Sequence, residues 1–104
     1  MITVYIYLNS EENCENLVTE LLKTKLVAHA SIDKDNNSMR VKNGVVTKEL
    51  LYVITAQTRA LLFTEIVQLV KLRINGETKV YSLPLTQCNE SFSEFIRQHT
   101  KTGI

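Results

Sequence analysis

The side chains best suited to chemistry in this chain are two histidines and two cysteines, which stand far apart in the sequence. His29 lies in the run 27–31, which is typical of a strand, and an imidazole there could be a metal ligand or a general base. No second ligand stands near it at metal-binding spacing, so the competing interpretation is a histidine hydrogen-bonded at a sheet or subunit contact. His99, near the C-terminus, is expected to be a solvated residue of a last helix. The two histidines share no motif, and the residues alone leave the role of His29 open.

The cysteines, Cys14 and Cys88, lack the spacing of a C-x-x-C pair. Cys14 falls near the start of a predicted helix, whose N-terminus can lower a thiol pKa. Glu12 and Glu15 oppose that effect, so we expect a structural or simply exposed thiol. Cys88 precedes the last predicted helix and is the better candidate for reactivity. Because the chain shows no export signal, we expect two free thiols. Neither these thiols nor His29 belong to an assembled nucleophile, base and orienting group, so we expect a protein that is not an enzyme.

Asp33 and Asp35 bracket a lysine in a polar stretch, and alternating carboxylates can bind a hard cation. The pattern of a calcium-binding loop is absent, however, so a solvated bend is the favoured interpretation. Glycine-rich phosphate loops, nucleophile elbows and the zinc motif H-E-x-x-H are absent as well.

The charge balance argues against nucleic acid as a partner. Twelve lysines and arginines oppose eleven acidic residues, for a net charge of +1, whereas nucleic acid needs a clustered basic surface. The same balance argues against a chain that coats anionic membranes. Aromatic side chains on strands can stack on RNA bases, but the RNP-type strand motif is missing. We therefore expect packing within the sheet or at an interface for all four tyrosines, which are Tyr5, Tyr7, Tyr52 and Tyr81.

The length of 104 residues predicts one domain, 1–104, with a modest hydrophobic core. The longest apolar run, near 50–56, is far shorter than the roughly 18 residues of a membrane-spanning helix. The N-terminus lacks the charged start and small-residue cleavage site of a signal peptide. These features predict a cytoplasmic protein without a membrane partner.

Hydrophobic periodicity and turn signals predict four strands and three helices. The predicted strands are 2–8, 26–32 with a polar interruption at 33–37 and a resumption at 38–41, 45–56 and 79–85. The predicted helices are 11–25, 59–72 and a short one that starts at Asn89. Ser10 and Thr58 are the predicted N-caps. Asn43-Gly44 is the strongest hairpin signal, because both central positions of that turn need a positive φ.

The β-α-β-β-α-β order predicts an α+β, ferredoxin-like sandwich with an antiparallel sheet and a short C-terminal helix. The run 50–54 is apolar on both faces, which favours a central strand. Val4 and Ile6 point to one face of the sheet, and Tyr5 and Tyr7 point to the other. Helices would cover only one face, so we predict that a partner subunit covers the second.

Several local sequences in this order resemble the CutA family, small proteins associated with divalent-cation tolerance. The resemblance spans essentially the whole chain. In the N-terminal part of the chain, it depends on the opening strand 2–6 and on the segment 21–28, where Leu-Leu is followed by a charged pair and then by Leu-Val-Ala. Further along the chain, Ser38 and Gly44 match the hairpin segment, and Leu83-Pro84-Leu85 matches a strand end. Phe92 and Phe95 take the aromatic positions of the last helix.

The resemblance implies a compact homotrimer in which long hairpin strands pair with neighbouring subunits. It also implies a role in tolerance of, or response to, divalent metal such as copper, by binding rather than catalysis. His29 stands where the family has a cysteine, which makes it the candidate metal ligand. An imidazole accepts Cu(II) or another divalent metal, whereas the lost thiolate weakens the argument for selective Cu(I) binding.

Polar positions depart from the family pattern more than scaffold positions do. Lys42 and Asn43 replace a tryptophan and a glutamate, 73–75 replaces His-Pro-Tyr, and Thr78-Lys79 replaces Pro-Glu. Lys79 removes a possible cation ligand and adds a repelling charge. These departures give the alternative hypothesis: a PII-like trimeric module that has lost the metal site and holds a small molecule in a cleft between subunits.

Overall fold

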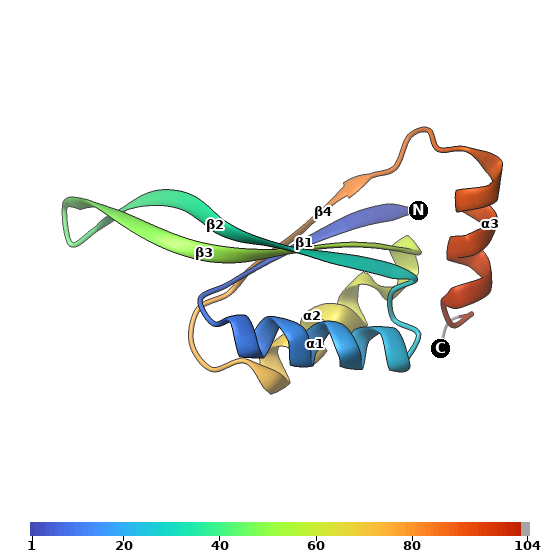
Figure 1. Ribbon diagram of the computed structural model, residues 1–104, viewed down its shortest axis with the longest axis horizontal. Helices are drawn as coiled ribbons and strands as arrows, with labels where there is room; N and C mark the ends of the chain where they lie inside the picture. The colour runs from blue at the N-terminus through green and yellow to red at the C-terminus, as the bar shows by residue number, and fades with distance from the viewer. Residues whose placement is uncertain (103–104) are drawn as a thin grey trace.

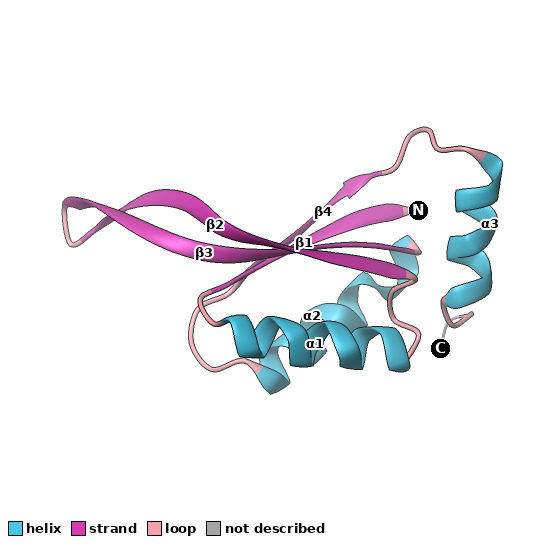
Figure 2. Ribbon diagram, in the orientation of Figure 1, coloured by secondary structure: helices cyan, strands magenta, loops and turns pink. Residues whose placement is uncertain are grey.

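The computed structural model describes residues 1–102, which form a four-stranded sheet with helices against one face (Figure 1, Figure 2). In chain order, the elements are β1 (Ile2–Leu8), α1 (Glu11–Lys23), β2 (His29–Lys42), β3 (Val45–Thr58), a 3₁₀ turn η1 (Ala60–Leu62), α2 (Phe63–Arg73), β4 (Lys79–Pro84) and α3 (Glu90–His99). Among the helices of residues 1–102, none is both long and apolar enough to cross a membrane.

The strand order across the sheet is β2-β3-β1-β4, and every neighbouring pair is antiparallel. This is the α+β ferredoxin-like arrangement, as predicted. β3 lies between β2 and β1, so the central position predicted for the segment 50–54 is confirmed for residues 52–54, whereas Leu50 and Leu51 pair with β2 alone.

The core lies between the sheet and helices α1 and α2 (Figure 2). Along β1, buried and partly exposed residues alternate with the period of two that a strand imposes. Its buried side chains are Ile2, Val4, Ile6 and Leu8. The helices contribute residues at helical spacing, chiefly Leu17, Leu21, Ile66 and Val70.

Helix α1 starts as predicted at Ser10, whose side chain accepts a hydrogen bond from the backbone N–H three residues on, at 3.4 Å. The helix ends at Lys23, two residues earlier than predicted, because Lys25 takes a positive φ of 60° that cannot continue it. The next strand begins at His29 rather than at residue 26, since residues 26–28 are buried in the connection between the layers.

Strands β2 and β3 form a hairpin of 14 residues each. Its turn is Asn43-Gly44, with φ values of 52° and 78°, which confirms the predicted positive-φ turn. The polar interruption at 33–37, whose composition is typical of a bulge or a bend, is a bulge. The register shifts between Asp33 and Asn36, and the strand continues through it.

Only half of this hairpin belongs to the two-layer body. β1 pairs with residues 52–58 of β3 and no further. The remainder, residues 36–51, which we call the projecting hairpin, extends past the helices and gives the molecule its longest dimension of 45 Å (Figure 1).

The predicted start of the second helix is wrong. Thr58 is the buried last residue of β3, and its hydroxyl donates to the carbonyl of Leu26 instead of capping a helix. The chain first turns through η1, and α2 begins at Phe63 without a side-chain cap. It ends at Arg73, one residue beyond the predicted end.

Helix α3 lies across one end of the sheet (Figure 1). It begins at Glu90, one residue after the predicted start, with Asn89 in the N-cap position, and Ile96 is its fully buried residue. Arg59 fixes the helix end to the body: its Nε donates to the hydroxyl of Thr100 at 2.8 Å, and its Nη2 donates to the carbonyl of Arg97 at 2.7 Å.

Candidate functional site

The sheet face opposite α1 and α2, which we call the open face, carries the side chains that alternate with the core residues. Thr3 of β1 pairs with Gln57 of β3 on one side and with Leu83 of β4 on the other. Gln57 pairs in turn with His29, the first residue of β2. Directly paired residues of antiparallel strands project from the same face. His29 therefore stands exposed on the open face, at the start of β2.

The ring of His29 is oriented by its neighbour in the sheet. Its Nδ1 lies 3.0 Å from the Oε1 of Gln57. When Nδ1 carries the proton and donates to this amide oxygen, Nε2 keeps its lone pair, and that is the form of imidazole that binds metals. The structure thus supports the predicted hydrogen bond and leaves a nitrogen suited to coordination.

One chain supplies an incomplete set of ligands at this point. Within residues 1–102 there is no group of three or more histidine, cysteine, aspartate or glutamate side chains placed to hold a metal ion. A metal site at His29 would need ligands from further chains or from solvent, and the predicted role of His29 stays a prediction.

The other candidates stand on separate elements. His99 ends α3, where its Nδ1 lies 3.0 Å from the carbonyl oxygen of Phe95 and its ring stacks on the Phe95 ring with centroids 4.2 Å apart. It is exposed, as predicted. Asp33 and Asp35 lie on either side of a lysine at the β2 bulge, where Asp35 takes a φ of 59°.

Both cysteines are free thiols, as predicted. Cys14 is buried in the core, and its pKa is raised from 9.0 to about 11, mainly by burial and further by the charges of Glu11 and Glu15. The thiol is therefore a poor nucleophile near neutral pH. Cys88 is exposed in the connection before α3.

Three of the four tyrosines gather on the open face. The ring of Tyr81 stacks on Tyr5 with centroids 5.0 Å apart and on Tyr7 at 6.1 Å, and the hydroxyls of Tyr7 and Tyr81 lie 3.3 Å apart. The hydrogen bond with Tyr7 raises the pKa of Tyr81. Tyr52 is different, because it pairs with Leu8 and packs against the core.

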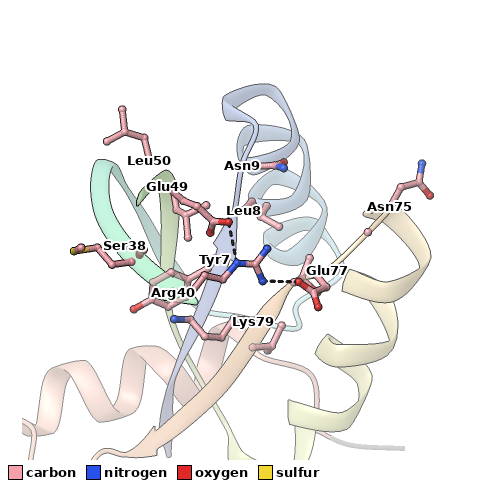
Figure 3. A pocket seen from close by; sticks show the side chains of 15 residues that line it. Tyr7, Leu8, Asn9, Ser38, Arg40, Glu49, Leu50, Asn75, Glu77 and Lys79 are labelled. Atoms are coloured by element: carbon pink, nitrogen blue, oxygen red, sulfur yellow. Dashed lines mark hydrogen bonds and ion pairs between the residues drawn. The ribbon is translucent and has the colours of Figure 1, made fainter. Parts of the chain in front are cut away.

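A cleft of about 880 Å³ opens where the projecting hairpin leaves the body (Figure 3). Four segments line it: residues 7–9, 38–40, 49–51 and 75–80. Its floor includes the ring of Tyr7, over which the ammonium of Lys79 lies at 3.9 Å from the ring centroid. This is a cation–π contact.

Arg40 is central to the cleft (Figure 3). Its Nε donates to Glu49 at 3.0 Å and its Nη1 donates to Glu77 at 2.7 Å. The arginine is the main cause of the lowered pKa of Glu77, and the charge of Lys42 adds to it. Arg40 thus connects the hairpin with the segment that precedes β4.

This cleft was not predicted from the sequence, in which Lys79 was interpreted only as a lost cation ligand and Arg40, Glu49 and Glu77 were not candidates. The two-residue turn at Asn43-Gly44 sets the register that places Arg40 and Glu49 on one face, so this pair could have been found from the sequence. The approach of Glu77 depends on tertiary packing, because 37 residues separate it from Arg40.

Known proteins resemble this chain in sequence pattern and in fold. A family model described as CutA1 divalent ion tolerance protein matches residues 2–99. Among curated proteins, none matches the chain.

Solved structures share the fold over nearly their whole length. CutA1 from Oryza sativa is 22% identical, with a TM-score of 0.93, covering 98% of this chain and 94% of that one. CutA1 from Pyrococcus horikoshii is 21% identical, with a TM-score of 0.89 and coverages of 98% and 100%. The periplasmic divalent cation tolerance protein CutA from Archaeoglobus fulgidus is 22% identical, with a TM-score of 0.90 and coverages of 97% and 100%. At these identities the structures show the fold, and the family match over residues 2–99 shows that this chain belongs to the CutA1 divalent ion tolerance family.

Proposed function

We propose that this protein is a homotrimer that serves divalent-cation tolerance by binding a cation such as Cu(II), with the imidazole of His29 as a ligand. The observation that carries the proposal is the contact between His29 Nδ1 and Gln57 Oε1 at 3.0 Å on the open face. A metal-binding histidine commonly uses its second nitrogen in this way, because the hydrogen bond fixes the tautomer and the ring orientation. Membership of a divalent ion tolerance family supports the same role.

The trimer is part of this proposal because one imidazole is a weak site. Copies joined through their open faces would bring several His29 side chains into the interface. The projecting hairpin also favours association, since five of its large apolar side chains are each 61–69% exposed: Met39, Val41, Val45, Val46 and Leu50. Four of them, Met39, Val41, Val46 and Leu50, project from the same face of the hairpin, and exposed apolar surface of this kind marks interaction sites.

Isothermal titration with Cu(II) tests the metal ligand. We expect His29→Ala to bind at least about tenfold more weakly than the wild type, because it loses a nitrogen donor to the metal. Equal binding by the two proteins would exclude His29 as a significant ligand.

The matched control is His99→Ala. This variant also removes one exposed imidazole, but from α3, where the ring is engaged with Phe95. We expect its Cu(II) affinity to equal that of the wild type. A loss of the same size in both variants would indicate nonspecific binding by surface histidines.

A second candidate function is small-ligand binding, as in PII-like modules, and the cleft beside Arg40 favours it. Its volume of about 880 Å³ falls within the range of about 300–1,000 Å³ typical of small-molecule sites. A bound ligand raises the unfolding temperature by mass action, so a thermal-shift screen with nucleotides and organic anions tests this function.

Both candidates are binding functions, and we propose binding rather than catalysis for this chain. The cytoplasmic location stays a prediction, and the Archaeoglobus fulgidus relative is described as periplasmic. Fractionation of cells that produce the protein from its own gene would decide the compartment.

A further inference from the structure

Arg40 has donor capacity beyond its two observed ion pairs. Its Nε is engaged by Glu49 and its Nη1 by Glu77. A guanidinium carries five N–H donors in a rigid fork, and two parallel donors of that fork match a carboxylate or a phosphate. The cleft in front of Arg40 could therefore accept an anion without loss of the contact with Glu49 (Figure 3).

The two carboxylates that hold Arg40 differ in how firmly they are placed. Glu49 belongs to β3 and pairs with Ser38 of β2, two residues from Arg40, and its side chain is 27% exposed. Glu77 lies in the connection between α2 and β4, outside any helix or strand, and its side chain is 83% exposed. An ion pair this exposed contributes little to stability. Glu77 is therefore the displaceable partner.

The surroundings of Glu77 favour a negative charge whichever group carries it. Arg40 and Lys42 both lower the pKa of the Glu77 carboxyl. Lys79 adds a further cation at the floor of the cleft, against the ring of Tyr7. Apolar side chains border the same space. Leu51 lines the cleft from the face of β3 that carries Glu49, and the ring of Tyr7 lies under Lys79.

We infer that this cleft binds a small organic anion, a carboxylate or phosphate group on an apolar body, and that the carboxylate of Glu77 occupies the anion's place on Arg40 until the ligand displaces it. The inference rests on the second proposed function, small-ligand binding, and it is independent of metal at His29. Arg40 supplies the forked donor, Lys79 supplies a second positive charge, and the apolar wall takes the body of the ligand.

Isothermal titration of the full-length protein with three probes tests the inference. The probes are inorganic phosphate, phenyl phosphate and benzoate. Phenyl phosphate against benzoate compares the two anionic groups, and phenyl phosphate against inorganic phosphate tests the contribution of the apolar body. We expect the wild type to bind phenyl phosphate or benzoate more tightly than inorganic phosphate. Whichever probe binds more tightly then identifies the preferred anionic group.

Two substitutions in the cleft are expected to move the affinity in opposite directions. Arg40→Gln removes the forked donor and should weaken binding at least about tenfold, because charge-assisted hydrogen bonds are the strong ones. Glu77→Gln removes the internal competitor and should tighten binding several-fold. Since Glu77 is exposed, this variant should fold even if Arg40→Gln does not.

The matched control is Arg73→Gln, which breaks the ion pair between Arg73 and Glu20, whose Nε to Oε1 distance is 2.8 Å. This pair joins α2 to α1, and neither residue lines the cleft. We expect the control to bind the probes as the wild type does.

Three results would overturn the inference. If no probe binds the wild type, the cleft is not an anion site, although the thermal-shift screen could still support other ligands. If a probe binds the wild type and Arg40→Gln equally, the protein binds small ligands elsewhere. If Glu77→Gln binds no more tightly than the wild type, Glu77 is not a displaceable occupant.

Discussion

The body of the sheet and the projecting hairpin use the same strands in opposite ways. In residues 52–58, β3 pairs on both sides and packs on the helices, and Ile54 and Ala56 are fully buried. In residues 45–51 of the same strand, β1 no longer pairs, and Val45, Val46 and Leu50 are exposed. The body is thus stabilised within one chain, whereas the exposed apolar side chains of the hairpin support our proposal that further copies cover it.

The largest expected effect comes from a substitution in the core of the body. Ile6→Ala should lower the free energy of unfolding by about 2–5 kcal/mol, because it leaves a cavity beneath the helices at a fully buried position. Urea denaturation measures this change. Val46→Ala on the hairpin is the matched truncation, at a residue that is 64% exposed, and its cost should be clearly smaller. Equal costs would mean that the hairpin is as tightly packed as the body.

The buried thiol of the body, Cys14, should make the free energy of unfolding depend on pH. The pKa of Cys14 is raised from 9.0 to about 11, so the folded state holds this proton more tightly than the unfolded state does. The resulting stability is present below pH 9 and is lost as the pH rises to about 11, by on the order of 2 kcal/mol.

Urea denaturation of wild type and Cys14→Ala at pH 8 and pH 10.5 measures this loss, and the difference between their pH slopes isolates Cys14 from other groups. We expect the variant to lose less stability over this range. A steeper or equal fall in Cys14→Ala would show that the thiol is not protected. Cys88, in contrast, should react with a thiol reagent in the folded protein at pH 8, because it is exposed.

Assembly should respond to charge on the hairpin. Val46→Asp places a carboxylate on a surface that we propose to be covered by another subunit, where an unpaired charge is costly to bury. We expect a smaller average mass in light scattering at micromolar concentration, with a circular dichroism spectrum like that of the wild type. An unchanged mass would remove this part of the hairpin from the proposed interface.

In the hairpin turn, Gly44→Ala should lower the free energy of unfolding by about 1 kcal/mol, because a residue with a side chain is strained at a φ of 78°. The cost should be conformational alone, since a Cβ at this position would meet nothing within 4 Å. Gly44→Asn is the control, because asparagine tolerates this backbone conformation and should lose less. Thermal unfolding of the three proteins measures the order, and a greater loss for asparagine than for alanine would contradict it.

The smallest effect belongs to His29. In metal-free buffer, His29→Ala should change the free energy of unfolding by no more than about 0.5 kcal/mol, because the side chain is exposed. A loss several times larger would mean that its bond to Gln57 serves the fold rather than a ligand.

Both regions were predicted from the sequence wherever the signal is local. The alternating residues of β1 and the turn at Asn43-Gly44 carry local signals, so the strand, the hairpin and the ferredoxin-like order were predictable. Thr58 was misassigned because its hydroxyl finds a partner in Leu26, 32 residues away in the sequence. A distant partner of that kind leaves no mark in the local pattern.

The candidate sites also differ in whether the sequence could indicate them. The resemblance to a family pointed to His29, and the register of β2 against β3 then explains its contact with Gln57. Arg40 and Glu77 meet because the connection before β4 packs against the hairpin, 37 residues away along the chain. Contacts between segments so distant in the sequence were beyond prediction from periodicity.

The central claim, that the apolar hairpin and open face are covered by further copies of this chain, is tested most directly by light scattering of the purified protein at micromolar concentration. The proposal predicts a particle with three times the 11.9 kDa mass of one chain. A monomer under these conditions would contradict it, because the hairpin would then stand uncovered in solution.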